Sequence, residues 1–190
     1  MVNQKTRRMV MAALLAALTT AATMVIRIPT PTLGYIHLGD SMVLICGILL
    51  GPGLGAAAAG IGSMLADLFS GFTAWAPGTF AIKALTALVG GSLYRLCLKR
   101  EHISPPLCVI LCGIPAEAVM VAGYFLYEVG MMALAGSDLS AAATAVLAGV
   151  PFNVVQGLTG IVVGVVLLPV LSHAGAGAEM PSRRRKSHNF

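Results

Sequence analysis

Charged residues are scarce in this sequence. Asp, Glu, Lys and Arg together make up 10% of its 190 residues, whereas about a quarter is usual in a soluble globular domain. Hydrophobic residues make up 57% of the chain. Such a chain cannot cover its surface with polar side chains. The composition therefore excludes an ordinary soluble domain and predicts a protein whose solvent is the lipid bilayer.

Motifs that carry out chemistry are also missing. The sequence contains no glycine-rich phosphate-binding motif, no serine–lysine or serine–histidine arrangement and no cluster with metal-ligand spacing. We therefore expect no catalytic residue, no metal and no cofactor, and any ATP would have to be hydrolysed by a partner. The cysteines lie in or beside apolar runs without disulfide or zinc spacing, and we interpret them as small core residues. They are Cys46, Cys97, Cys108 and Cys112.

Long apolar runs dominate the rest of the sequence. A membrane-spanning helix needs about 20 mostly apolar residues, and the runs predict an all-α membrane protein, a six-helix transmembrane bundle. The second run is too short to cross a bilayer alone at 1.5 Å per residue, so it is either packed inside protein or lengthened by the preceding segment. The bundle occupies residues 9–171, between an N-terminus (1–8) and a basic tail (172–190) that we expect to be disordered. The six predicted helices are 9–28, 40–50, 54–70, 78–96, 105–131 and 146–171.

Basic residues indicate the orientation of the bundle. They precede the first helix, lie around the fourth connection and fill the tail, whereas the opposite connections (29–39, 71–77 and 132–145) contain none. The positive-inside rule then predicts that both termini are cytoplasmic. We expect the tail to touch anionic lipid rather than nucleic acid. The basic residues of this pattern are Lys5, Arg7, Arg8, Arg95, Lys99, Arg100, Arg183, Arg184, Arg185 and Lys186.

The few polar residues of the apolar runs lie at one depth, in the outer halves of the predicted helices. An ionisable group inside a bilayer costs at least ~2.5–3.5 kcal/mol on insertion scales, so it usually faces a cavity or a partner. The set predicts a polar pocket open to the outside. For a single residue the alternative is an internal ion pair, such as Lys83 with Asp67 or Glu117, and for an aromatic ring it is an interfacial belt. The pocket candidates are Tyr35, His37, Asp40, Asp67, Trp75, Thr79, Lys83, Glu117, Tyr124, Asn153 and Gln156.

The segment IPTPTLGYIHLGD, residues 28–40, is unusually polar for a connector between apolar runs. Pro29 cannot continue a helix and biases the preceding residue to an extended conformation. Tyr35 and His37 are placed to reach the outer pocket. Asp40 either contributes to that pocket or caps the second helix.

The first helix carries two rows of small side chains. Ala13, Ala17 and Ala21 form one row, and Ala12 and Ala16 begin the adjacent one. Small residues at four-residue spacing let helices approach closely in lipid. The rows predict close packing, either against helices of this protein or against a second membrane subunit.

Three stretches carry a family resemblance: IPTPTLGYIHLGD (28–40), GPGLGAAAAGIGSMLADLFSG (51–71) and WAPGTFAIKAL (75–85). With the six helices and the alanine-rich first helix, they resemble the substrate-binding S components of energy-coupling factor (ECF) vitamin transporters. Among the S components, the order and the residues of the three stretches resemble those of the riboflavin-type and the hydroxymethylpyrimidine- or pyridoxine-type members. The resemblance covers residues 9–170, so the bundle is expected to be a substrate-binding domain.

The resemblance implies a binding protein, not an enzyme, that takes a vitamin from outside under a lid formed by the loop after the first helix. It would deliver the vitamin through a membrane coupling subunit and two ATPase subunits, with the alanine rows of the first helix against the coupling subunit. A hydroxymethylpyrimidine- or pyridoxine-like ligand is our first choice, while riboflavin, pantothenate and queuosine precursors stay open. One alternative of another class is a secondary transporter driven by protons on Asp67 or Glu117. A second is an intramembrane enzyme that uses His37, Asp40, Asp67 and Glu117.

Overall fold

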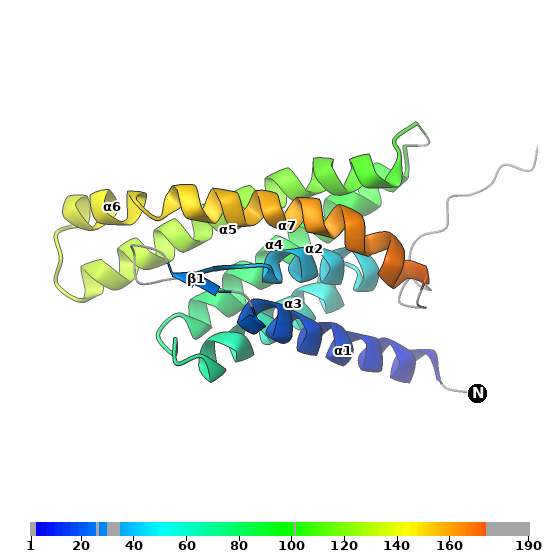
Figure 1. The fold of residues 1–190 in the computed structure, drawn as a ribbon, viewed down its shortest axis with the longest axis horizontal. Helices are drawn as coiled ribbons and strands as arrows, with labels where there is room; N and C mark the ends of the chain where they lie inside the picture. Colours follow the sequence, from blue (N-terminus) through cyan, green and yellow to red (C-terminus); the bar gives the residue numbers. More distant parts are fainter. Residues whose placement is uncertain (1–2, 26, 30–34, 101, 174–190) are drawn as a thin grey trace, which may run out of the picture.

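The computed structural model describes residues 3–25, 27–29, 35–100 and 102–173. Within these ranges the chain forms seven helices and one two-stranded antiparallel sheet (Figure 1). The elements in chain order are α1 (Gln4–Val25), β1 (Arg27–Pro29), β2 (Tyr35–His37), α2 (Gly39–Leu50), α3 (Pro52–Phe69), α4 (Ala76–Leu98), α5 (Pro105–Leu134), α6 (Leu139–Leu147) and α7 (Val150–Leu171).

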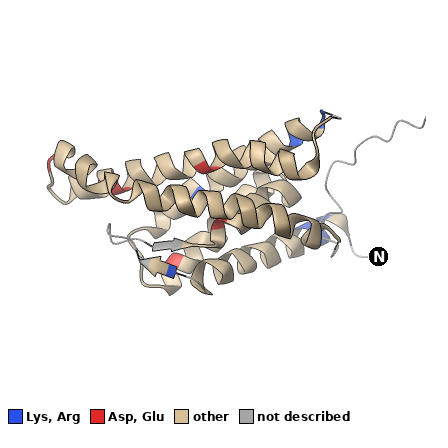
Figure 2. Cartoon of the chain, turned by 45° about the horizontal axis from the view of Figure 1, so that its top comes forward, with Lys and Arg blue, Asp and Glu red and all other residues tan. Residues whose placement is uncertain are grey.

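The chain runs back and forth along the long axis of the molecule (Figure 1). The start of α1, the α4–α5 connection and the end of α7 lie at one end, and the β1–β2 hairpin and α6 lie toward the other. Five helices are long and apolar enough to cross a membrane, namely α1, α3, α4, α5 and α7. The predicted all-α membrane fold is thereby confirmed. Figure 2 shows that Lys and Arg gather at the end that holds the N-terminus, the pattern that predicts a cytoplasmic orientation for this end.

Helix α2 lies in the middle of the bundle. All of its 12 residues are buried, because α1, α3, α4 and α7 all pack against it. At 1.5 Å per residue it is about 18 Å long, well short of the ~30 Å hydrocarbon core. It ends at Leu50, and the positive φ of 85° at the following Gly51 allows the sharp turn into α3. The short second segment predicted from the sequence is therefore packed inside protein.

Close approach of α2 and α4 depends on glycine. A Cβ atom on Gly47 would overlap with the backbone oxygen of Ala87, and one on Gly91 would overlap with the backbone oxygen of Gly47. The two helices thus touch backbone to backbone, which brings together the polar residues in their N-terminal halves.

The segment after α1 differs from the expected loop. The first helix ends at Val25 rather than at residue 28, and Arg27–Pro29 pairs with Tyr35–His37 in an antiparallel hairpin, with Arg27 opposite His37. Proline explains the early end of the helix, because the residue before a proline is driven to an extended conformation. Residues 30–34 lie outside the described part of the chain.

A second difference concerns the connection expected at 132–145. Helix α5 continues to Leu134, and a separate helix α6 occupies most of the remaining connection. Asp138 caps α6, since its carboxylate accepts hydrogen bonds from the backbone N–H of Ser140 (3.0 Å) and Ala141 (3.3 Å). A hydrogen bond from the Ser140 hydroxyl, followed by these two backbone bonds, lowers the pKa of Asp138. The predicted single helix 146–171 was wrong at its start, because Pro151 in the first turn of α7 begins a new helix there.

The two predicted domain boundaries lie near the two ends of the chain. Helix α1 begins at Gln4, inside the segment 1–8 that we expected to precede the bundle. The predicted basic tail lies outside the described residues from residue 174 onward, including Arg183, Arg184, Arg185 and Lys186.

Candidate ligand-binding site

A fully buried ion pair lies at the N-terminal end of α2. The Nζ atom of Lys83 on α4 donates to Oδ1 of Asp40 on α2, and neither side chain is exposed. The ion pairs considered from the sequence, Lys83 with Asp67 or Glu117, were therefore the wrong pairs. Gly160 of α7 makes room for this arrangement, because a Cβ atom there would lie 2.8 Å from Cβ of Asp40.

Gln156 of α7 joins this ion pair to the hairpin. Its Nε2 atom donates to Oδ2 of Asp40 (2.6 Å), and its Oε1 atom accepts from the backbone N–H of His37 (2.9 Å). Both oxygens of Asp40 are thus bonded to side chains from other helices. The alternative role of Asp40 as a helix cap is not supported, because the residue before α2 is Leu38 and Asp40 lies within the first turn.

His37 holds the chain between β2 and α2. Its Nδ1 atom accepts a hydrogen bond from the backbone N–H of Gly39 at 2.9 Å. Burial, followed by the positive charge of Lys83, lowers the pKa of His37 to about 3. The imidazole is therefore neutral at physiological pH, as an accepting Nδ1 requires.

Tyr124 of α5 completes the polar cluster on the α4 side. Its hydroxyl donates to Oγ1 of Thr79 at 3.1 Å, and its ring centre lies 5.1 Å from Nζ of Lys83. A lysine over an aromatic face gains cation–π attraction when it is removed from water. Five elements (β2, α2, α4, α5 and α7) thus contribute to one polar cluster, which consists of His37, Asp40, Thr79, Lys83, Tyr124 and Gln156.

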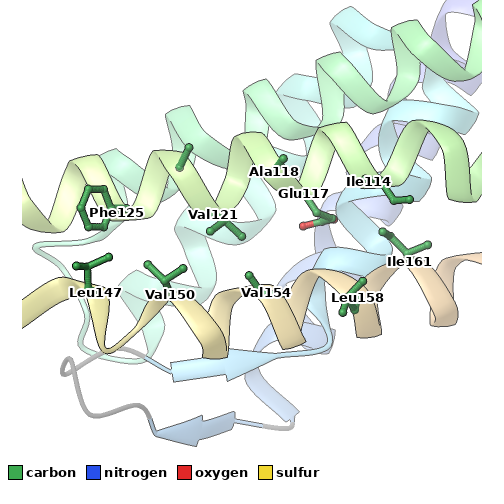
Figure 3. Close-up of a pocket in the computed structure, with 11 residues that line it drawn as sticks. Ile114, Glu117, Ala118, Val121, Phe125, Leu147, Val150, Val154, Leu158 and Ile161 are labelled. Atoms are coloured by element: carbon green, nitrogen blue, oxygen red, sulfur yellow. The ribbon is translucent and has the colours of Figure 1, made fainter.

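Beside this cluster, a cavity of about 450 Å³ opens between α5, α6 and α7 (Figure 3). Glu117 is the one lining residue with a polar side chain, and Figure 3 shows its carboxylate directed between α5 and α7. Glu117 is 5% exposed, yet neither carboxylate oxygen has a hydrogen-bond partner among the described residues. The lining residues are Ile114, Glu117, Ala118, Val121, Ala122, Phe125, Leu147, Val150, Val154, Leu158 and Ile161.

A glycine of α7, Gly157, allows the close approach of this helix to Glu117. A Cβ atom on Gly157 of α7 would lie 2.9 Å from Cβ of Glu117 and 3.2 Å from its Oε2. Gly157 follows Gln156 in the chain, so the cavity and the polar cluster share one turn of α7. Glu117 also lies within electrostatic range of Asp40 and Lys83.

The remaining residues predicted to line the pocket belong neither to the polar cluster nor to the cavity wall. Asp67 near the end of α3, Trp75 at the start of α4 and Asn153 in α7 take no part in the hydrogen bonds that join Asp40, Lys83 and Gln156, and they do not line the cavity. The backbone of Tyr35 lies in β2, but its side chain is outside the described part of the structure. Sequence reasoning missed the apolar wall of the cavity, because valine, leucine and isoleucine look the same in any membrane helix.

The structure separates the two alanine rows of α1. Thr20, in the row of Ala12 and Ala16, donates its hydroxyl to the backbone oxygen of Gly62 on α3 at 2.8 Å, and a Cβ atom on Gly62 would overlap with the backbone oxygen of Ala16. The row of Ala12 and Ala16 thus packs against α3, in line with the alternative of packing against helices of this protein. The row that stays exposed consists of Ala13, Ala17 and Ala21.

Fold and site together define an all-α, multi-pass membrane protein with a buried polar cluster beside an apolar cavity. Residues 3–173 match the model of the family described as "ECF-type riboflavin transporter, S component", and the chain belongs to this family. It is a transport subunit of a vitamin transporter, associated with an ECF module, and not an enzyme. The alternatives from other classes, a secondary transporter and an intramembrane enzyme, find no support in this family.

Two individual proteins are also similar to the chain. A solved structure described as "Structure and mechanism of the S component of a bacterial ECF transporter" is 23% identical, with a TM-score of 0.69, and the match covers 90% of this chain and 98% of that one. It has the same fold. An uncharacterised protein of Pyrococcus woesei is 38% identical over 106 residues, which is 55% of this chain and 67% of the relative.

Proposed function

We propose that this S component captures a small heteroaromatic vitamin or precursor, of hydroxymethylpyrimidine or pyridoxine type. The observation that carries the proposal is the carboxylate of Glu117, buried in an apolar cavity with both oxygens unbonded among the described residues. A buried carboxylate is strongly disfavoured unless hydrogen-bond donors meet it. A ligand with donors on one edge supplies them.

The chemistry of hydroxymethylpyrimidine matches such a carboxylate. Its ring carries an amino group beside a ring nitrogen, so one carboxylate oxygen accepts from the amino group and the other shares a proton with the ring nitrogen. Phe125 and the aliphatic side chains of α5 and α7 offer apolar walls for a flat ring. Riboflavin is the alternative that the family description names, but its polyhydroxylated chain needs several polar partners, and the cavity lining supplies one.

A ligand panel tests this proposal. The purified chain in detergent is titrated with hydroxymethylpyrimidine, pyridoxine and riboflavin, and binding is followed by isothermal calorimetry. We expect one of the two small rings to bind at least tenfold more tightly than riboflavin. Tight binding of riboflavin with none of the small rings would overturn the proposed ligand while leaving the family intact.

We further propose that the module consists of one membrane coupling subunit and two ATPases, which hydrolyse ATP, and that the chain itself holds no cofactor. The exposed row Ala13, Ala17 and Ala21 then faces the coupling subunit, because its small side chains let a partner helix approach closely.

Co-purification tests this partner surface. Ala17→Trp should abolish co-purification of the module while leaving ligand binding unchanged. Ala81→Trp introduces the same side chain at an exposed alanine of α4 and should have no effect. Retention of the module by Ala17→Trp would exclude this row as the contact.

A lid role for the hairpin belongs to the same proposal. The hairpin precedes α2. It is attached to α7 by the hydrogen bond from the backbone N–H of His37 to the side chain of Gln156. Movement of β1–β2 away from α7 must therefore break a bond to a residue that also holds Asp40. Opening of the lid and the geometry of the polar cluster are linked by this one side chain.

A further inference from the structure

Two cysteines meet where α4 ends and α5 begins. Sγ of Cys97, in the last turn of α4, lies 2.6 Å from Sγ of Cys108, in the first turn of α5. The spacing along the chain gave no sign of this contact, which arises because the α4–α5 connection reverses the chain. A third cysteine, Cys112, lies one turn further along α5 and within electrostatic range of both.

The two thiols of this pair differ in accessibility. Cys108 is fully buried, whereas Cys97 is partly exposed, next to the connection that carries Lys99 and Arg100. A reagent in water therefore reaches Cys97 first, and Cys108 is already in place to react with whatever Cys97 has formed. This is the arrangement of an attacked thiol beside a resolving thiol.

We infer that Cys97 and Cys108 form a redox-modification site, in which an external disulfide converts the two thiols into a disulfide between α4 and α5. The Cys97 thiolate attacks one sulfur of the external disulfide, and the first external thiolate leaves. The Cys108 thiolate then attacks the sulfur of Cys97, and the second external thiolate leaves. Two protein thiols are oxidised, the external disulfide is reduced to two thiols, and the two protons of the cysteines pass to the leaving groups.

The bond would fix the connection between two long helices. Closing this short loop restricts the unfolded chain and stabilises the folded one. In a reducing compartment such a pair stays in the thiol form, and it closes only when oxidised disulfides accumulate. The site is separate from the ligand cavity, which begins at Ile114 of α5.

Peptide mass spectrometry tests the inference. The full chain in detergent is incubated with oxidised glutathione, blocked with an alkylating reagent and digested without reduction. We expect a peptide linked through Cys97 and Cys108, lighter by two hydrogens than the sum of its parts, and a melting temperature raised by about 5 °C or more. Cys46→Ala and Cys112→Ala should both keep this link.

Single variants of the pair separate the two steps. Cys108→Ala should leave Cys97 as a stable glutathione adduct, and Cys97→Ala should leave Cys108 unmodified. If Cys97→Ala does not fold, Cys97→Ser serves for the same measurement. A stable glutathione adduct on Cys97 of the wild-type chain, a link to Cys112 instead, or unmodified thiols throughout would each overturn the inference.

Discussion

At the residue scale, Gln156 connects parts of the molecule that are far apart in the sequence. One side chain bonds the backbone of the hairpin and the buried carboxylate of Asp40 at the same time. An amide suits this position because it donates with one end and accepts with the other. Sequence reasoning selected Gln156 together with Asn153, and only the structure shows which amide of the two is used.

Replacing Gln156 should weaken both attachments. Gln156→Leu leaves Oδ2 of Asp40 and the N–H of His37 without their observed partner, and each buried orphan group costs about 1–3 kcal/mol. We expect a free energy of unfolding in detergent lower by at least ~2 kcal/mol. Asn153→Leu, three residues earlier in α7, is the matched control, and an equal loss in both variants would contradict this role.

The ion pair of Lys83 and Asp40 predicts strong non-additivity. Lys83→Met leaves an unpaired buried carboxylate, which is destabilising by about 3–5 kcal/mol. Lys83→Met with Asp40→Leu removes both charges, so the double variant should be more stable than the single one. Thermal unfolding of the three variants closes this double-mutant cycle. If the loss of stability in the double variant equals the sum of the losses in the two single variants, the two charges are not paired.

His37 predicts a pH dependence of stability. Its pKa is lowered to about 3 in the folded chain, against about 6.5 when unfolded. The folded state therefore binds fewer protons, and the contribution of His37 is fully present above pH ~6.5 and lost as the pH falls toward 3. By pH 5 the loss amounts to as much as about 2 kcal/mol.

Denaturant titrations at pH 8 and pH 5 measure this loss. His37→Asn should remove most of the pH dependence, because asparagine has no proton to gain. His102→Asn, in the α4–α5 connection, is the control. The account of His37 fails if the dependence survives in His37→Asn.

At the scale of elements, the long helices follow from composition, and the short elements do not. The runs of α3, α4, α5 and α7 are apolar over the length of a membrane span, so their existence was predictable. The β1–β2 hairpin was not, because three-residue strands carry too little pattern to separate from a loop. Helix α6 was missed for another reason: its start depends on the cap at Asp138, a local signal inside an apolar region.

The close crossing of α2 and α4 predicts that Gly91 tolerates no larger side chain. In Gly91→Ala the new Cβ atom meets the backbone of Gly47, which cannot move as a side chain would. We expect a loss of about 1–3 kcal/mol of stability. Gly130→Ala is the matched control, since nothing lies within 4 Å of a Cβ atom there and alanine favours the helix. Equal effects in thermal unfolding would contradict the close approach of the two helices.

At the scale of the whole molecule, the sequence predicted a polar pocket at one depth, and much of that set does come together. Asp40, Lys83 and Gln156 could be predicted as site residues because polar side chains are rare in membrane helices. The partners of each were not predictable, since the α2–α4 crossing and the glycines of α7 decide them. The apolar cavity beside Glu117 had no signal at all in the sequence.

The central claim is that Glu117 binds the ligand in this cavity, and its most direct test is an affinity measurement on two variants. Equilibrium dialysis with hydroxymethylpyrimidine compares the wild-type chain with Glu117→Gln and with Glu128→Gln, which changes a second buried glutamate of α5 outside the cavity lining. We predict that Glu117→Gln raises the dissociation constant at least tenfold, or about 1.4 kcal/mol, and that Glu128→Gln leaves it within twofold. Equal affinity in the wild-type chain and in Glu117→Gln would contradict the claim.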